Sequence, residues 1–144
     1  SKSGEIHHTT GISRCQYLLG EKSHKYCDIL RPEGSERQMG TTIHQKLVRD
    51  QIPDIIQRSG ASAVVRRLSE EDYREALNQK LLEEVNEFLE DENPEGLADI
   101  LEVIYAILAL KTLSFSALEE LRQCKQQKSG GFAQRWFLES VHAD

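Results

Sequence analysis

Carboxylate side chains interrupt the apolar pattern of two neighbouring stretches of the sequence. Residues 81–88 read Leu-Leu-Glu-Glu-Val-Asn-Glu-Phe, and residues 96–103 read Gly-Leu-Ala-Asp-Ile-Leu-Glu-Val. A buried carboxylate is costly unless a cation or hydrogen bonds compensate its charge. Carboxylates that converge between two helices are most simply compensated by a hard divalent metal ion such as Mg²⁺. The pattern therefore indicates metal-assisted chemistry on a phosphate substrate.

Helical periodicity sorts the first group of carboxylates by face, since a helix turns by about 100° per residue. Glu84 falls inside an apolar stripe, Glu87 lies on its border, and Glu83 lies further toward solvent. The stripe consists of Tyr73, Leu77, Leu81 and Phe88. For Glu83, as for Glu90, solvation of an exposed face is the favoured interpretation, whereas the position of Glu84 favours a metal ligand.

The second group has the same spacing, because Asp99 and Glu102 are also three residues apart and therefore neighbours on a helix surface. Asp99 belongs to one apolar stripe of this helix, and a second stripe lies roughly opposite. A helix that is apolar on two sides is packed on two sides. We therefore expect it to be central in a bundle or covered by another subunit, as in a homodimer or higher homo-oligomer.

Local signals place these groups on helices. Acidic residues after Ser69 predict a long helix over about 70–90, and Asn93-Pro94 predicts the start of a second that ends near Lys111. A third helix is predicted from Ser114 or Ser116 to about Lys128, with Gly130 as its stop. Shorter elements are predicted as well: a helix around Pro53 that ends at Ser59-Gly60, a strand over 63–68 and an extended segment over 132–138.

Composition narrows the classes of protein. The chain has 144 residues, of which 38% are hydrophobic and 29% charged, as in globular proteins. Its net charge of -6 argues against a general nucleic-acid binder. The longest apolar run, 103–110, is too short to span a membrane, and no signal peptide is visible. Three cysteines without a framework spacing indicate reduced thiols, and we expect a cytoplasmic protein.

Residues 1–40 differ from the rest, since they follow neither a helical nor an alternating period. Residues 41–144 form the predicted domain, and 1–40 an extension of unknown role. The extension contains residues of zinc-ligating type, but their spacing matches no standard pattern, and a loosely packed extension is the favoured interpretation. These residues are His7, His8, Cys15, His24 and Cys27.

Three segments in order resemble the MazG-like superfamily of all-α nucleoside triphosphate pyrophosphatases. The acidic signature Glu-Glu-x-x-Glu is present at 83–87. Two further segments are similar to the house-cleaning, phosphoribosyl-ATP pyrophosphohydrolase-like subgroup: Lys-Leu-Val-Arg-Asp at 46–50, and Gly-Gly-Phe at 130–132 followed by Arg135. The resemblance covers about residues 43–140. It implies an all-α fold, a helical hairpin or bundle with short extended flanking segments.

The resemblance also implies an activity, the hydrolysis of nucleoside triphosphates, non-canonical ones among them, to a monophosphate and pyrophosphate. Mg²⁺, or Mn²⁺ in its place, bridges carboxylates and phosphate oxygens in such chemistry. The expected metal ligands are Glu84, Glu87, Asp99 and Glu102. Glu83 and Glu84 are the expected catalytic residues, and Glu83 is assigned to the attacking water. The expected phosphate-binding residues are Lys46, Arg49, Lys128 and Arg135.

One departure from the signature stands in the second acidic stretch. The superfamily has Glu-x-x-Asp there, whereas this chain has Gly96-Leu97-Ala98-Asp99. Glu102, Glu95 or a water molecule is then needed to complete the metal site. The alternative function is a catalytically impaired nucleotide-binding or regulatory protein on the same fold.

Overall fold

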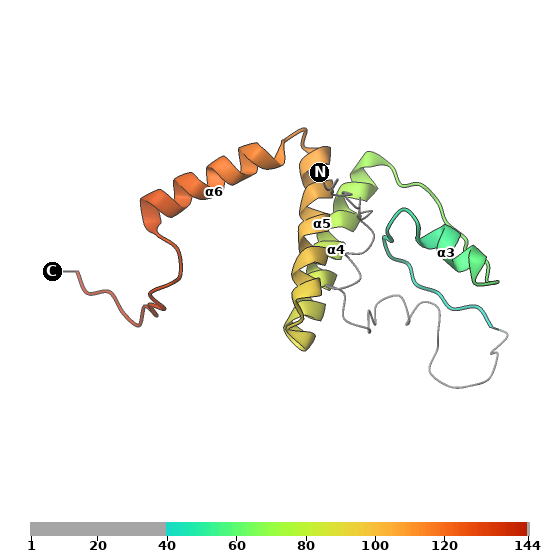
Figure 1. Cartoon of the computed structure of the whole chain (residues 1–144), viewed down its shortest axis with the longest axis horizontal. Coiled ribbons are helices and arrows are strands. Elements are labelled where there is room, and N and C mark those ends of the chain that lie inside the picture. The colour runs from blue at the N-terminus through green and yellow to red at the C-terminus, as the bar shows by residue number, and fades with distance from the viewer. Residues whose placement is uncertain (1–39, 144) are drawn as a thin grey trace, which may run out of the picture. The chain divides into compact units, whose positions relative to one another are not determined.

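The structure is a computed structural model that describes residues 40–143 (Figure 1). These residues form four α-helices and no β-strand, which confirms the all-α prediction. The chain divides into two compact units between Ser69 and Glu70, and each is described by itself. Apart from Gly40, the predicted extension and the zinc-type residues within it lie outside the described residues.

In the first unit, the short helix α3 (Ile52–Arg58) forms as predicted. Pro53 stands in its first turn, where the missing N–H of proline is not needed. Ser59 ends the helix by donating its hydroxyl to the carbonyl of Ile56 at 2.6 Å, and Gly60 follows with a φ of 90°. The predicted strand over 63–68 is wrong. Val64 and Val65 are exposed in an irregular segment, and the described residues contain no other strand with which this backbone can pair.

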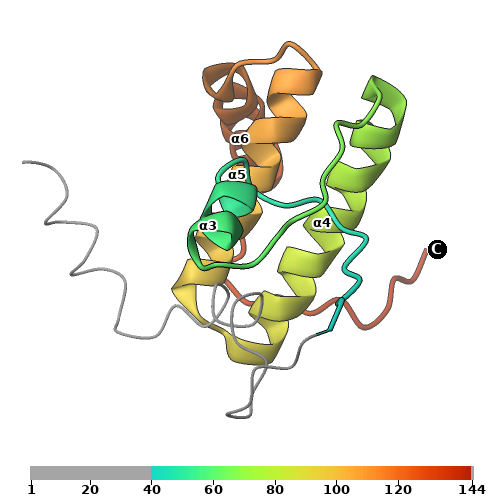
Figure 2. The ribbon, with the colours of Figure 1, turned by 90° about the vertical axis from the view of Figure 1, so that its right-hand side faces the viewer.

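The second unit is built on two long helices, α4 (Glu70–Asp91) and α5 (Pro94–Leu110). The short connection through Glu92 and Asn93 makes them an antiparallel hairpin (Figure 2). Asn93 caps α5, because its side-chain oxygen accepts a hydrogen bond from the backbone N–H of Glu95 at 3.1 Å. The two long helices, their limits and the Asn93 cap agree with the sequence prediction.

The hairpin core is small and runs along the interface between α4 and α5. Leu77 from α4 and Val103 and Leu108 from α5 are buried, and the two helices contact each other. Near the turn Gly96 brings the helices closest together. A Cβ atom at this position would lie 3.0 Å from the Cβ and 3.3 Å from the Cα of Phe88. Because one of these atoms belongs to the backbone of α4, a side chain at 96 requires the helices to move apart.

The third helix, α6 (Phe115–Ser129), leaves the hairpin at a sharp corner of 109° to α5. Ser114 caps it by accepting a hydrogen bond from the backbone N–H of Ala117 at 3.1 Å. The rings of Tyr105 and Phe115 stack across the corner with centroids 4.9 Å apart, which adds a tertiary contact between α5 and α6. Gly130 ends α6 with a φ of 82°, as predicted. Beyond it the chain makes a turn from Phe132 to Arg135, not the extended run predicted for this segment.

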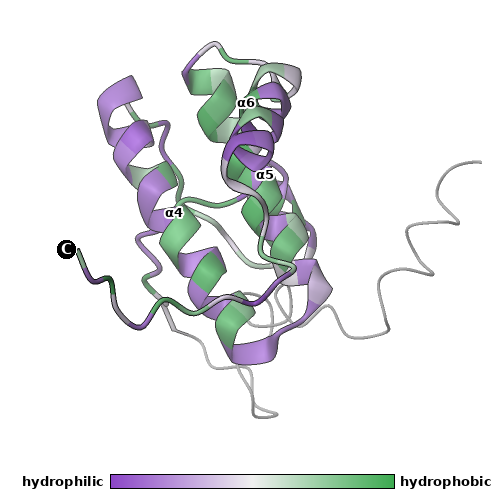
Figure 3. Ribbon diagram, turned by 90° about the vertical axis from the view of Figure 1, so that its left-hand side faces the viewer, coloured by the Kyte–Doolittle hydropathy of each residue, from purple (hydrophilic) through white to green (hydrophobic). Residues whose placement is uncertain are grey.

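Apolar residues occur on more than one side of α5 (Figure 3). Within the unit only one side is covered, by α4, and an apolar stripe of Leu97, Leu101 and Tyr105 stays exposed. No side chain of α6 is buried. No single helix among residues 40–143 has both the length and the apolar character needed to cross a membrane, and the pair α5 and α6, which together meet those criteria, is sharply bent.

The close approach at Gly96 leads to a stability prediction. Gly96→Val is expected to lower the free energy of unfolding by about 1–3 kcal/mol, because its added atoms meet both the side chain and the backbone of Phe88. Urea denaturation measures the loss. The matched control is Ala98→Val on the exposed side of the same helix, which is expected to cost less than about 1 kcal/mol. Equal losses for the two variants would contradict a close contact at Gly96.

Candidate functional site: a buried glutamate in the hairpin

Glu84 is the buried charged residue of the described chain, with 6% of its surface exposed. It lies on the face of α4 that carries Leu77, seven residues or two turns away. The prediction that Glu84 belongs to the apolar stripe is therefore confirmed. A carboxylate in this position needs compensation, because its transfer out of water is unfavourable.

Lys80 supplies the compensating charge from one turn earlier on the same helix. Its ammonium nitrogen lies 3.0 Å from a carboxylate oxygen of Glu84 and 3.1 Å from one of Glu83. The Lys80 side chain is only 17% exposed, so solvent screens these pairs less than it screens pairs on the surface. Burial by itself lowers the pKa of Lys80, but the hydrogen bonds and charges of Glu84 and Glu83 outweigh it and raise the pKa above its ordinary value.

The other predicted acidic residues differ in their exposure. Glu83 and Glu87 on α4 are half-buried. Asp99 on α5 is also half-buried and lies one turn from both Gly96 and Val103, which are buried in the interface with α4. Glu102 is exposed. Glu84 is thus buried, Glu87 and Asp99 are partly covered, and Glu102 lies toward solvent.

A divalent metal ion fits this site in one respect and not in another. The donors are carboxylate oxygens, which Mg²⁺ and Mn²⁺ prefer, and Glu84 sits where a cation is needed. However, among residues 40–143 no three Asp, Glu, His or Cys side chains are gathered in a way that could hold a metal ion. The Lys80 ammonium also contacts two of the predicted acidic residues. A metal ion at Glu84 therefore has to share or replace the contact with Lys80.

The acidic signature has a glutamate where this chain has Gly96, and the packing of α4 against α5 offers a structural reason for the glycine. A glutamate there begins with the same Cβ atom, which would lie 3.0 Å from the Cβ of Phe88. A carboxylate at position 96 therefore requires Phe88 to give way by a few tenths of an ångström. The hairpin gains close packing at the place where the signature has a metal ligand.

The predicted phosphate-binding residues lie outside the hairpin. Lys46 and Arg49 precede α3 in the first unit, and both are exposed. Lys128 is in the last turn of α6, where its charge complements the helix dipole, and Arg135 follows the turn after α6 with a φ of 57°. Both of these are exposed as well.

Lys80 is the site residue that the sequence analysis missed. The signal was its spacing, three residues before Glu83 and four before Glu84, which makes it a neighbour of both on a helix. Lysine is not a usual metal ligand, so a pattern of metal-binding carboxylates does not point to it.

Comparison with known proteins gives little further guidance. No protein-family model matches the chain, and no solved structure is similar to it. A stretch of 42 residues, 29% of the chain, is 52% identical to an uncharacterized protein of Mycolicibacterium smegmatis. The chain spans 43% of the length of this curated relative. Such a match leaves the family undecided, and the argument for function rests on the site.

The Lys80–Glu84 pair can be tested by the free energies of unfolding of its single and double variants. Lys80→Met is expected to lower the free energy of unfolding by about 3 kcal/mol, because it removes the positive charge that lies 3.0 Å from the buried Glu84 carboxylate. The double variant Lys80→Met/Glu84→Leu removes both charges and is expected to recover to within about 1 kcal/mol of the wild type. Denaturant unfolding of the two single variants and the double variant measures the coupling.

The control for this cycle is the exposed pair of Arg74 and Glu70, 3.5 Å apart with side chains 60% and 74% exposed. Arg74→Met is expected to cost less than about 1 kcal/mol, since solvent screens this pair. If Lys80→Met lowers the free energy of unfolding no more than Arg74→Met does, the Lys80–Glu84 pair does not stabilise the fold as proposed.

Proposed function

We propose that the protein is a Mg²⁺-dependent nucleoside triphosphate pyrophosphohydrolase that releases a monophosphate and pyrophosphate, with non-canonical nucleotides among its substrates. The observation that carries the proposal is the buried carboxylate of Glu84 in a hairpin of two antiparallel helices, on which Glu87 and Asp99 are half-buried. The resemblance of residues 83–87 to the superfamily signature supports the same activity.

In this proposal Glu84, Glu87 and Asp99 hold the metal ion, and Glu102 or Glu95 contributes from the edge of the site. Mn²⁺ serves as an alternative ion. The ion supplies neutralisation of phosphate charge when it is bound. In the proposal Glu83 orients a water molecule, and its contact with the Lys80 ammonium at 3.1 Å supports a fixed direction for its carboxylate.

A second candidate has its own support. Gly96 takes the place of one acidic ligand and packs on Phe88, and Lys80 already provides a positive charge at Glu84. Both features stabilise the hairpin without a metal ion. They favour a catalytically impaired nucleotide-binding or regulatory protein on the same fold, in which the hairpin is retained for binding and not for turnover.

The exposed stripe of Leu97, Leu101 and Tyr105 supports the further proposal of a homodimer or higher homo-oligomer. One side of α5 is covered by α4, and a second copy that presents the same stripe would cover the other in a self-complementary interface. A nucleotide remains the proposed partner and the cytoplasm the proposed location, with no nucleic acid expected because of the net charge of -6.

Pyrophosphate release tests the proposed activity. Wild-type protein is expected to release pyrophosphate from members of a panel of canonical and modified nucleoside triphosphates when Mg²⁺ is present and to stop when EDTA is added. Glu84→Gln and Asp99→Asn are each expected to lower the rate at least about a hundredfold, because each removes a charged donor from the metal.

Two further measurements keep this result interpretable. Circular dichroism shows whether each variant keeps its helices, and Glu90→Gln on the exposed side of α4 is expected to retain the full rate. Release by the wild type that does not depend on Mg²⁺, or that survives both substitutions in folded protein, would refute the proposed activity. Absence of release with nucleotide binding intact would favour the impaired binding protein.

A further inference from the structure

The C-terminal part of the second unit, residues 115–141, forms an arm that the hairpin does not cover. The arm consists of α6 and the segment after Gly130. No side chain of α6 is buried, and every residue from Leu121 to Ala143 is exposed. A helix of 15 residues is only marginally stable in water when it does not pack on another element. The arm therefore needs a surface that residues 40–143 of its own chain do not supply.

Large apolar side chains are exposed along this arm. Three of them are aromatic and follow Gly130: Phe132, Trp136 and Phe137, with 97%, 90% and 87% of their surface exposed. Exposed aliphatic side chains accompany them, namely Leu121, Leu138 and Val141. An apolar group of this size on one segment marks a contact with another macromolecule.

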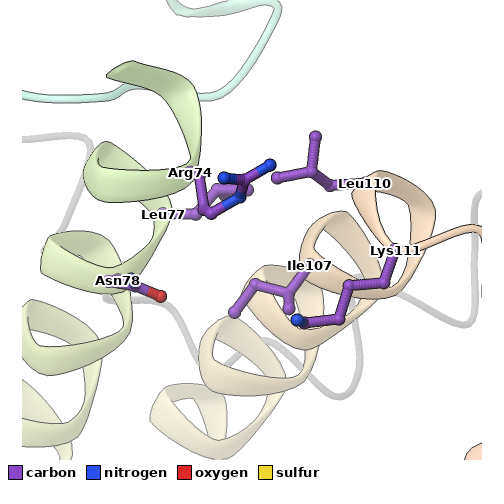
Figure 4. Close-up of a pocket in the computed structure, with 6 residues that line it drawn as sticks. All are labelled: Arg74, Leu77, Asn78, Ile107, Leu110 and Lys111. Atoms are coloured by element: carbon purple, nitrogen blue, oxygen red, sulfur yellow. The ribbon is translucent and has the colours of Figure 1, made fainter. Parts of the chain in front are cut away.

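The arm leaves α5 on the side of the exposed stripe. Ile107 and Leu110 extend from α5 toward α4, into the space where Leu77 also lies (Figure 4). Tyr105 belongs to the exposed stripe instead, and its ring stacks on that of Phe115, the first residue of α6. A molecule that covers the stripe therefore meets the arm as well.

The charges of the arm and the hairpin are complementary. The hairpin, residues 70–110, contains thirteen acidic and two basic residues, whereas residues 121–138 of the arm contain four basic residues and no acidic one. The four are Arg122, Lys125, Lys128 and Arg135, and all are exposed. Two acidic hairpins repel each other unless cations lie between them. The arm carries such cations, so its charge fits the hairpin of a second copy.

The area of contact leads to the same partner. A stable interface buries about 800 Å² on each partner. The three partly exposed side chains of the stripe on α5 cannot provide this area by themselves. The three aromatic side chains of the arm add roughly 500 Å², because an aromatic side chain buries about 150–250 Å². A dimer held by the stripe and the arm together thus comes close to the size of a stable one.

We infer that two copies of the chain exchange their arms, so that α6 and residues 130–141 of each copy lie against the hairpin of the other, beside the exposed stripe of α5. The basic residues of the arm then face the acidic hairpin, and Trp136 is buried. The inference names the contact surfaces of the homo-oligomer put forward under the proposed function, and it rests on that proposal for the presence of a second copy. It requires neither a metal ion nor turnover.

Trp136 is the single tryptophan of the chain, so its fluorescence reports on the arm. Sedimentation velocity of the full chain in EDTA is expected to show a dimer that dissociates on dilution and at high salt. Dissociation is expected to shift the emission of Trp136 to longer wavelength, because the ring returns to water.

Two double variants test the arm. Phe132→Ser/Phe137→Ser is expected to raise the dissociation constant of the dimer at least about tenfold, because aromatic anchors carry much of the energy of an interface. Lys125→Glu/Lys128→Glu is expected to raise it similarly, through repulsion by the acidic hairpin. The matched control is Val64→Ser/Val65→Ser in the first unit, where the valines are 102% and 60% exposed, and it is expected to leave the dimer unchanged.

Isotope labelling decides whether the arm lies on its own hairpin or on that of a second copy. Unlabelled and ¹⁵N-labelled protein are mixed, allowed to exchange and treated with a carbodiimide, which joins a lysine to a carboxylate in contact with it. Cross-links from Lys125 or Lys128 to the hairpin are expected to pair unlabelled with labelled peptides. Cross-links between peptides of equal label only would overturn the exchange of arms.

Two further outcomes would also overturn the inference, and they differ in what else they contradict. A wild-type protein that stays monomeric contradicts the proposed homo-oligomer as well. A dimer that forms equally well in Phe132→Ser/Phe137→Ser contradicts the exchange of arms alone. Failure of the proposed pyrophosphatase activity has a different signature, since it leaves the dimer in EDTA intact.

Discussion

The ion pair of Glu84 and Lys80 is the constraint on which the hairpin depends. A carboxylate that is 6% exposed is unfavourable in a small helical interface unless a positive charge lies next to it. Lys80 provides that charge at 3.0 Å from within the same helix, so the compensation is local and forms as soon as α4 forms. Glu84 can therefore remain at the contact between α4 and α5. Any exogenous cation has to bind in competition with, or beside, this internal one.

The contact of Gly96 with Phe88 has a comparable effect at the turn. It lets α4 and α5 approach until a Cβ atom at position 96 would be tightly packed against Phe88, and glycine has no side chain from which a further carboxylate could extend. At position 96, close packing of the helices and a fourth carboxylate ligand for a metal ion are thus alternatives. The hairpin has a small core of its own and an exposed apolar stripe on α5.

The sequence predicted the elements whose signals are local. Asn93 and Ser114 cap α5 and α6 through their own side chains, and Gly130 ends α6 with positive φ, so these boundaries depend on a few adjacent residues. The burial of Glu84 followed from helical periodicity alone. The strand over 63–68 failed because β-branched residues give only a preference, and a strand also needs a partner that the described chain does not supply. The role of Lys80 was not predicted although its spacing from Glu83 and Glu84 is a local signal, because a lysine is not a metal ligand. The reason for Gly96 was not predicted because it depends on how α4 and α5 pack in the assembled hairpin.

The most direct test of this account is the pKa of Lys80, followed by NMR titration of its side-chain ammonium group in the full chain. The Lys80 pKa is expected to lie above 10.5, because Glu84 and Glu83 stabilise the charged form more than burial destabilises it. The pair then stabilises the fold fully below pH 10.5 and loses its contribution as the pH rises through the raised pKa. Glu84→Gln is predicted to lower the Lys80 pKa. A wild-type pKa at or below 10.5 that Glu84→Gln leaves unchanged would contradict the buried pair at the centre of the hairpin.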